Sequence, residues 1–192
     1  MLNTSSYYWS TPDGTGTLSA SPNDLVAVYT PGTDETGIIR LVLTAEADGG
    51  CGDVVTDELL LTINPVATSD AGEDQIVCVG ETVTLDGQTT NSTDFIWTTT
   101  GSGSFVPNAK TLTAQYQPAP SDYGLGSVTL TLTATALESC ADVSDDMVVD
   151  FAPAPNINAG DDAQICAGAS YDLFDASVPT GINPQWTIVD GD

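Results

Sequence analysis

The sequence predicts an all-β chain made of tandem copies of one β-sandwich domain, on the strength of three observations. A ten-residue segment repeats, because residues 71–80 read AGEDQIVCVG and residues 159–168, which follow 88 positions later, read AGDDAQICAG. Apolar and hydroxyl residues alternate over several short runs. No run has the apolar spacing of three and four that an amphipathic helix needs. A long, fixed period of this kind is typical of an array in which one small domain is copied along the chain.

The three tryptophans recur at the same interval. Trp9, Trp97 and Trp186 are 88 and 89 residues apart. Alignment on these anchors divides the chain into a C-terminal two thirds of one copy (1–68), a complete copy (69–156) and the N-terminal third of another (157–192). We refer to these units as the first, second and third copy. Because both ends then fall inside a domain, we expect the chain to come from a longer protein.

Short runs with a period of two predict the strands. In chain order, the runs of the second copy are 82–86, 95–97, 128–134 and 147–151. In residues 128–134, valine, leucine and alanine alternate with threonine, which places apolar side chains on one face and hydroxyls on the other. The first copy repeats two of these runs, at 39–45 and 59–63. The first and second copies therefore have two predicted strands in matching places.

Turn residues separate these runs, for example at 100–103 and 118–122. Six or seven short antiparallel strands in a copy of about 90 residues are typical of an immunoglobulin-like sandwich, and helices should be nearly absent. Trp97 could be a stacking platform for a sugar, but its neighbours alternate as buried strand residues do. We therefore predict that Trp97 lies in the core, where burial of its ring stabilises the domain by roughly 2–3 kcal/mol. The other predicted core residues are Leu85, Tyr116, Leu130 and Leu132.

The four cysteines predict disulfides rather than a metal site. The chain has no histidine, and no two cysteines have the spacing of a zinc knuckle. Disulfides in an oxidising compartment are the better account. A bond between Cys78 and Cys140 would close a loop inside the second copy and stabilise it by about 4 kcal/mol. The alternative is to pair Cys51 with Cys78 and Cys140 with Cys166, which would link neighbouring copies.

The charge balance is strongly acidic. Two basic residues, Arg40 and Lys110, stand against 27 carboxylates, for a formal net charge of −25. A chain with so little positive charge is not expected to bind nucleic acid or an anionic membrane, and no apolar stretch is long enough for membrane insertion. The acidic surface keeps a β-rich chain soluble and discourages its sheet edges from pairing.

Some of the carboxylates gather near the joints between copies and are candidates for calcium, the one cofactor that the sequence suggests. Calcium is bound by six to eight oxygen ligands, which a linker and a neighbouring loop could supply together. No cluster has the spacing of a calcium-loop motif. The candidate ligands are Asp70, Glu73, Asp74, Asp142, Asp145, Asp146, Asp161 and Asp162.

Catalysis is not predicted. Without histidine, the remaining routes are a carboxylate pair or a serine with lysine. The aspartates mostly occupy turns rich in glycine and threonine, and Lys110 occurs in one copy only. No catalytic residue is therefore assigned.

The chain resembles the PKD-like and immunoglobulin-like repeats of giant, SprB-type cell-surface adhesins of gliding Bacteroidetes. The matching elements are the motif A-G-x-D-x-x-I-C-x-G at 159–168, its variant with Val77 before Cys78, the run VTLTLTA at 128–134, and Cys140 six residues after that run. The resemblance covers all three copies. It implies export by type IX secretion, display as a long extracellular filament, and adhesion to surfaces or polysaccharide during gliding motility.

We therefore expect a structural and interaction protein, namely the stalk of a secreted, cell-surface adhesin whose immediate partners are neighbouring repeats of the same chain. One alternative keeps the fold and assigns the loops a carbohydrate or calcium-dependent ligand. Another is a non-catalytic spacer of a secreted polysaccharide-degrading enzyme. Many further copies beyond either end would favour the adhesin, and a catalytic domain would favour the spacer.

Overall fold

The structure is a computed structural model that describes residues 4–19, 24–47, 54–138, 140–153, 155–181, 183 and 185–187. Regular structure in these residues is almost all β-strand, and the one helix among them, α1 (Pro120–Tyr123), has four residues. The all-β class predicted from the sequence is therefore confirmed. No helix in these ranges has the length and apolar character needed to cross a membrane.

The first copy contains two antiparallel sheets. One has the strand order β1-β4-β5. Its strands are β1 (Thr4–Ser10), β4 (Gly37–Ala47) and β5 (Val54–Ile63). The other sheet pairs β2 (Thr17–Ser19) with β3 (Val28–Thr30). The alternating run in β4 buries Ile39 and Leu41, as its period of two predicts.

The second copy contains nine strands among its described residues. They are β6 (Thr68–Asp70), β7 (Gln75–Cys78), β8 (Val83–Thr84), β9 (Gln88–Thr90), β10 (Ser92–Thr99), β11 (Ser104–Val106), β12 (Gln115–Gln117), β13 (Ser127–Ala136) and β14 (Val143–Ala152). A four-stranded sheet has the order β10-β13-β14-β7, and a three-stranded sheet has the order β11-β12-β8. The remaining two strands, β6 and β9, pair with each other.

The core of the second copy is built from side chains of both larger sheets. Trp97 comes from β10 and is only 1% exposed, which excludes it as a surface platform for a sugar. The predicted core residues Leu85, Tyr116, Leu130 and Leu132 are buried with it. A sheet-on-sheet core of this kind is that of a β-sandwich, as predicted.

The strand pairing differs from the prediction in one respect. The sequence suggested only antiparallel strands, yet β7 pairs with β14 in parallel, with Gln75 opposite Val149 and Cys78 opposite Ala152. The two strands are 64 residues apart in sequence, from Cys78 to Val143, so the connection between them is long enough to bring them together in the same direction. The short strands β6, β8 and β9 account for the count above six or seven.

The main strand pairs of the first and second copies have the same register. Trp9 lies opposite Leu43 where β1 meets β4, and Trp97 lies opposite Leu132 where β10 meets β13. The next pair agrees as well, because β4 and β5 align as β13 and β14 do. The sequence repeat is therefore also a repeat of strand pairing.

The third copy has no strand among its described residues. Its one β-type contact is an isolated bridge between Asn158 and Ser177. Trp186 is 59% exposed, unlike Trp97, and lies beside an open hollow of about 370 Å³. Counterparts of β13 and β14, which follow β10 in the same sheet of the second copy, are not present in these residues.

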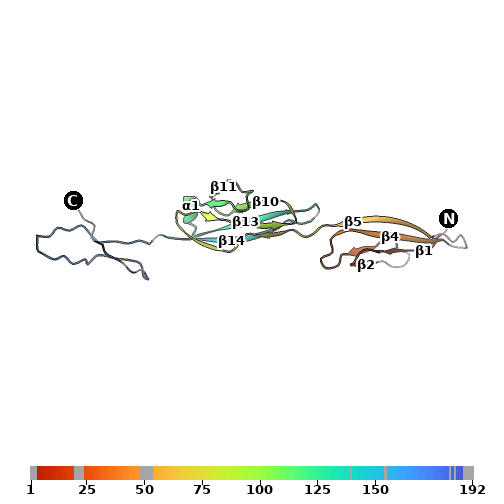
Figure 1. The fold of residues 1–192 in the computed structure, drawn as a ribbon, viewed down its shortest axis with the longest axis horizontal. Coiled ribbons are helices and arrows are strands. Elements are labelled where there is room, and N and C mark those ends of the chain that lie inside the picture. The colour runs from red at the N-terminus through yellow and green to blue at the C-terminus, as the bar shows by residue number, and fades with distance from the viewer. Residues whose placement is uncertain are drawn as a thin grey trace.

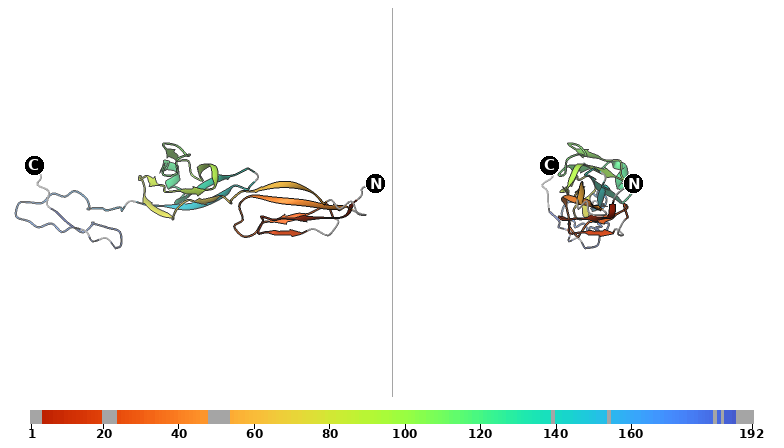
Figure 2. Two further views of the ribbon diagram at one scale, coloured as in Figure 1. Left: turned by 45° about the vertical axis from the view of Figure 1, so that its right-hand side comes forward. Right: turned by 90° about the vertical axis from the view of Figure 1, so that its right-hand side faces the viewer.

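Figure 1 shows the sheets of residues 4–63 and those of residues 68–152 one after the other along the long axis, with residues 155–187 beyond them. The turned views of Figure 2 show the same order and a narrow outline when the molecule is seen end-on. The N-terminal and C-terminal parts therefore lie at opposite ends.

Candidate functional site

The most elaborate polar site in the second copy surrounds the carboxylate of Asp122, on helix α1. Asp122 is fully buried. Its carboxylate accepts four hydrogen bonds, from the Ser102 amide (2.7 Å), the Gly103 amide (3.1 Å), the Ala119 amide (3.0 Å) and the Tyr116 hydroxyl (2.7 Å). The donors belong to two loops and to strand β12, so one side chain holds three segments together. We call this arrangement the carboxylate anchor.

The loop that donates to the anchor needs glycine at its two ends. A Cβ added to Gly101 would lie 2.6 Å from the Tyr116 hydroxyl oxygen, and one added to Gly103 would lie 2.4 Å from the Gln117 carbonyl oxygen. Both distances are too short for non-bonded atoms. Glycine at these positions lets the loop backbone lie directly on the tyrosine ring, within reach of the carboxylate.

The first copy holds the same anchor, with Glu35 in the place of Asp122, 87 residues earlier. Its carboxylate accepts hydrogen bonds from the Thr15 amide (2.6 Å), the Tyr29 hydroxyl (2.7 Å) and the Gly32 amide (2.8 Å). The tyrosine hydroxyl also accepts a bond from the Gly16 amide at 3.0 Å, as Tyr116 does from its own glycine at 3.2 Å. Each of these donors is offset by 87 residues from its counterpart, so the two anchors share three carboxylate bonds and the bond from glycine to tyrosine, and the bond from the Gly103 amide to Asp122 is an addition in the second copy.

The hydrogen bonds keep both carboxylates ionised. At Glu35 the bond from the Gly32 amide, and next the bond from Tyr29, lower the pKa from 4.5 to about 2. At Asp122 burial raises the pKa, but the bonds from its four donors outweigh burial and the pKa lies below its usual value. Burial is also the main cause that raises the pKa of Tyr116. Each anchor is thus a neutral phenol that donates to a charged carboxylate.

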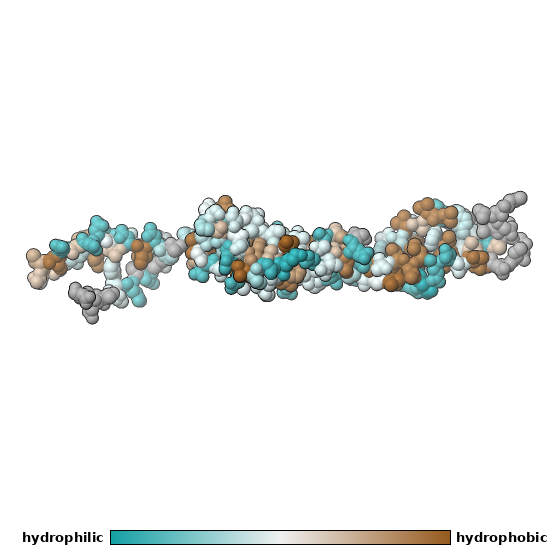
Figure 3. All heavy atoms as spheres, turned by 90° about the horizontal axis from the view of Figure 1, so that it is seen from above, coloured by the Kyte–Doolittle hydropathy of each residue, from teal (hydrophilic) through white to brown (hydrophobic). Residues whose placement is uncertain are grey.

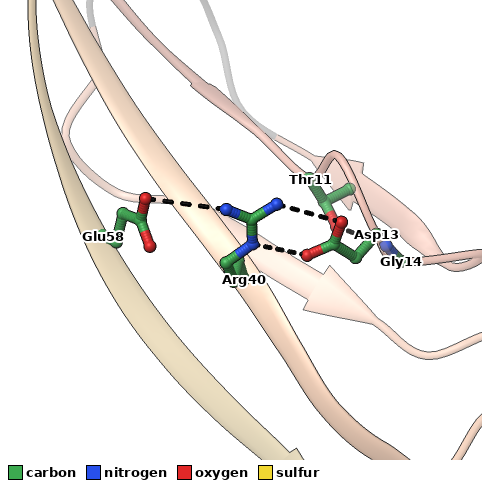
Figure 4. A network of polar contacts seen from close by, with 5 residues as sticks. All are labelled: Thr11, Asp13, Gly14, Arg40 and Glu58. Atoms are coloured by element: carbon green, nitrogen blue, oxygen red, sulfur yellow. Dashed lines mark hydrogen bonds and ion pairs between the residues drawn. The ribbon is translucent and has the colours of Figure 1, made fainter.

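A second polar network, on the surface of the first copy, is drawn in Figure 4. The guanidinium of Arg40 on β4 holds Asp13 through two hydrogen bonds, of 2.6 and 3.2 Å, and Glu58 on β5 lies 3.7 Å from its other side. Arg40 lowers the pKa of Asp13. The partners are exposed, so this network contributes little to stability. The other basic residue, Lys110, forms an ion pair with Asp94.

The structure does not assemble the predicted calcium ligands. Within the described ranges, no three histidine, cysteine, aspartate or glutamate side chains are close enough together to hold a metal ion. Four of the eight candidate carboxylates instead accept bonds from backbone amides. The pairs are Asp70 with Gly72 (2.9 Å), Asp74 with Val148 (2.7 Å), Asp142 with Ala136 (2.9 Å) and Asp145 with Ala71 (2.8 Å).

The structure also does not bring the predicted disulfide partners together. Cys78, Cys140 and Cys166 are each free, and Cys51 lies outside the described residues. Cys78 lies opposite Ala152 at the end of β14, whereas Cys140 lies in the turn before the other end of that strand. A ten-residue strand separates them by about 30 Å, and a disulfide requires Cα atoms within about 7 Å. A Cys78–Cys140 bond inside the second copy is therefore incompatible with this fold.

The anchors were not predicted from the sequence. The run of turn residues at 118–122, which ends at Asp122, predicts only a turn. A signal was present, because Gly-x-Gly, a tyrosine followed two residues later by proline, and an acidic residue recur at a constant offset of 87. The acidic residue is glutamate in the first copy (Glu35) and aspartate in the second (Asp122), so a search for identical residues at this offset misses the pair.

No family model matches the chain, and no curated protein matches it in sequence. Several solved structures are distantly similar. Human mucin-like protocadherin EC1-2 is 15% identical, with 77% of this chain and 85% of that chain covered and a TM-score of 0.35. The protocadherin gammaB7 EC3-6 cis-dimer is 12% identical, with 79% and 44% covered and a TM-score of 0.34. Protocadherin Gamma B2 extracellular cadherin domains 3-6 are 14% identical, with 79% and 44% covered and a TM-score of 0.32. The chain thus spans less than half of the last two proteins, and no function follows from likenesses at this level.

Proposed function

We propose that the chain is part of the shaft of a secreted, surface-displayed adhesin, built from tandem immunoglobulin-like (PKD-like) sandwich repeats. The observation that carries the proposal is the recurrence of one architecture. The strand registers around Trp9 and Trp97 agree, and the anchors at Glu35 and Asp122 share three carboxylate bonds with donors at equivalent positions. Repeats that preserve their internal supports from one copy to the next are typical of an array in which one domain is copied along the chain.

The division into copies at 1–68, 69–156 and 157–192 is part of this proposal. The support for it is local. The second copy has its own core, from Ala71 to Phe151, and its own anchor. The stretch 64–67 that precedes β6 is short, which suits a series of domains with limited freedom between neighbours.

Small-angle X-ray scattering of the dilute 192-residue chain tests the extended arrangement. The expected pair-distance distribution has its peak at a short distance, set by the width of a single sandwich, and a tail that extends to long distances. The distribution of a compact globule, with one symmetric peak, would overturn the proposal. High salt is a useful control, because an extension caused only by repulsion among the 27 carboxylates would shrink as salt screens it.

The cellular side of the proposal follows from the resemblance to SprB-type repeats. On that basis the parent protein is exported by type IX secretion, displayed at the cell surface, and used for attachment to surfaces or polysaccharide during gliding. Antibodies raised against the chain should label intact source cells along thin extracellular filaments. Labelling only after the cells are opened would contradict surface display.

A further inference from the structure

The linker between the first and second copies is fastened to the second copy before the first strand of that copy begins. Strand β5 ends at Ile63 and β6 begins at Thr68, so residues 64–67 form this linker. The side-chain amide of Asn91 donates to the Val66 carbonyl at 3.0 Å, and Ala67 is only 3% exposed. The second half of the linker is therefore part of the second copy.

Strand β6 extends this attachment along the chain. It pairs with β9, and the Ser69 hydroxyl donates to the Leu132 carbonyl of β13 at 2.7 Å. The Ala71 amide then donates to Asp145 on β14 at 2.8 Å. From Val66 to Ala71 the entering chain is thus bonded in turn to the turn before β10 and to strands β9, β13 and β14.

Asn91 is suited to the position from which it holds the linker. It forms the turn between β9 and β10, where its φ is +52°. Asparagine and aspartate adopt this left-handed conformation more readily than most other residues that carry a Cβ. The Val66 side chain is 74% exposed, so a hydrogen bond and not apolar burial fixes that residue. We call the bond from Asn91 to Val66 the linker latch.

The latch leaves a hinge of two residues, Asn64 and Pro65, and neither can rotate widely. The proline ring fixes the φ of Pro65 near −65°. It also restricts the residue before it to an extended conformation. A proline stands at the same place 88 residues later, as Pro153. The hinge therefore favours an extended chain with little freedom to bend.

Direct packing between the two copies adds little to the joint. Among the described residues, the extensive contacts between strands all lie within one copy or the other. Figure 3 shows the surfaces of the two copies meeting only at their ends. The direction of one copy relative to the other therefore depends on the linker and on the groups that hold it.

The chain that enters the third copy repeats part of this attachment. Asn158 accepts a hydrogen bond from the Gly160 amide at 2.9 Å, as Asp70 at the end of β6 accepts one from the Gly72 amide at 2.9 Å. Asn158 also forms an antiparallel bridge with Ser177, which corresponds to the pairing of β6 with β9. Fastening of the entering chain to the domain that follows is therefore a property of the repeat.

We propose that the second copy sets the direction of the copy before it, and that Asn91 is the residue through which it does so. The closed latch confines bending to residues 64–65 and makes the joint a stiff, extended connection. An open latch lengthens the hinge to residues 64–67, so the joint becomes flexible while both copies stay folded. The proposal concerns this joint alone and does not require the adhesin role.

Residual dipolar couplings of the weakly aligned, isotope-labelled full chain measure how rigidly the two copies are joined. In the wild-type chain, the couplings of residues 4–63 and 68–152 should fit a single alignment tensor. Asn91→Asp keeps the shape and turn preference of the side chain but replaces the donor with an oxygen that repels the Val66 carbonyl. The two copies of this variant should then align differently and need separate tensors.

Two further variants make the comparison specific. Thr93→Ala is the matched control, because Thr93 follows the same turn and its hydroxyl donates to the Thr135 carbonyl at 3.3 Å, within the second copy. This variant should keep the single tensor. Pro65→Gly frees the hinge itself and should give separate tensors, as Asn91→Asp does. The amide spectrum of residues 68–152 shows whether each variant is folded.

Elastase provides a second readout, because it cleaves after small apolar residues and reaches the bonds after Val66 and Ala67 only when the latch is open. Loss of one hydrogen bond should make this cleavage about fivefold faster in Asn91→Asp, as measured by mass spectrometry of the fragments, and leave it unchanged in Thr93→Ala.

Three results would each overturn the proposal: separate tensors in the wild-type chain, a single tensor in Asn91→Asp or Pro65→Gly, or equal cleavage of Asn91→Asp and wild type. An extended scattering profile together with separate tensors in the wild-type chain would remove the latch and leave the shaft proposal standing.

Discussion

At the scale of single residues, the most consequential side chain is Asp122. A buried charge is costly unless hydrogen bonds replace the water it has lost. Asp122 satisfies this condition with four donors, which in turn would be unsatisfied without it. The anchor therefore couples the fit of two loops to the ionisation of one carboxyl.

Replacement of the Asp122 carboxylate should destabilise the fold severely. Asp122→Asn substitutes an NH₂ group for one oxygen, and that group would face donors instead of accepting from them. We expect the free energy of unfolding to fall by about 2–4 kcal/mol, as for other broken buried networks. Urea denaturation followed by circular dichroism measures this loss. Asp146→Asn, on the exposed side of β14, is the matched control and should change stability by less than about 0.5 kcal/mol.

Acid should weaken the anchors within a definite pH range. Because the pKa of Glu35 is lowered from 4.5 to about 2 in the folded chain, its contribution is complete above pH 4.5 and is lost as the pH falls toward 2. The lowered pKa of Asp122 acts in the same direction. The melting temperature should therefore fall between pH 5 and 2, and Glu35→Gln should flatten part of this slope. An unchanged slope in the variant would contradict the role assigned to Glu35.

Sequence reasoning succeeded for residues whose role follows from periodicity and failed where the role depends on contacts. Trp97 and Leu132 were predicted as core residues, because the alternation around each fixes which face is buried. Asp122 could not be predicted in the same way. Its burial depends on the loop at 101–103, which folds back over Tyr116 from another part of the chain.

At the scale of elements, the long strands were predictable and their partners were not. The strict alternation of 128–134 locates β13, and the shorter run at 147–151 locates β14. The residue pattern of β7 and β14 does not reveal that the two strands pair in parallel, because the direction of pairing is decided by tertiary packing. The same limit applies to Cys78 and Cys140, because the sequence does not show that the length of β14 lies between them.

The turn between β10 and β11 depends on its glycines. Gly103→Ala would place a methyl group 2.4 Å from the Gln117 carbonyl oxygen and 2.6 Å from the Tyr116 ring. We expect a loss of roughly 1–3 kcal/mol in the free energy of unfolding, measured by urea denaturation. Gly124→Ala is the matched control, because its nearest neighbour lies 3.4 Å away and its backbone is helical. Equal effects of the two substitutions would mean that the close approach is not the cause.

At the scale of the whole molecule, two anchors in separate copies should act independently. Hydrogen exchange with mass spectrometry tests this in the intact chain. Asp122→Asn should speed exchange in residues 68–152 and leave residues 4–63 unchanged, whereas Glu35→Gln should do the reverse. Faster exchange in both regions after either substitution would show one cooperative unit instead of serial domains.

The parallel alignment of β7 and β14 determines how the second copy responds to tension. The chain enters this domain shortly before β7 and leaves it directly after β14, and the two strands point the same way. Pulling on the two ends would drag these strands past each other lengthwise. All the hydrogen bonds between them would then be loaded in shear at the same time, instead of breaking one after another. Resistance to stretching is thus a direct product of the one strand pair that runs against the antiparallel pattern.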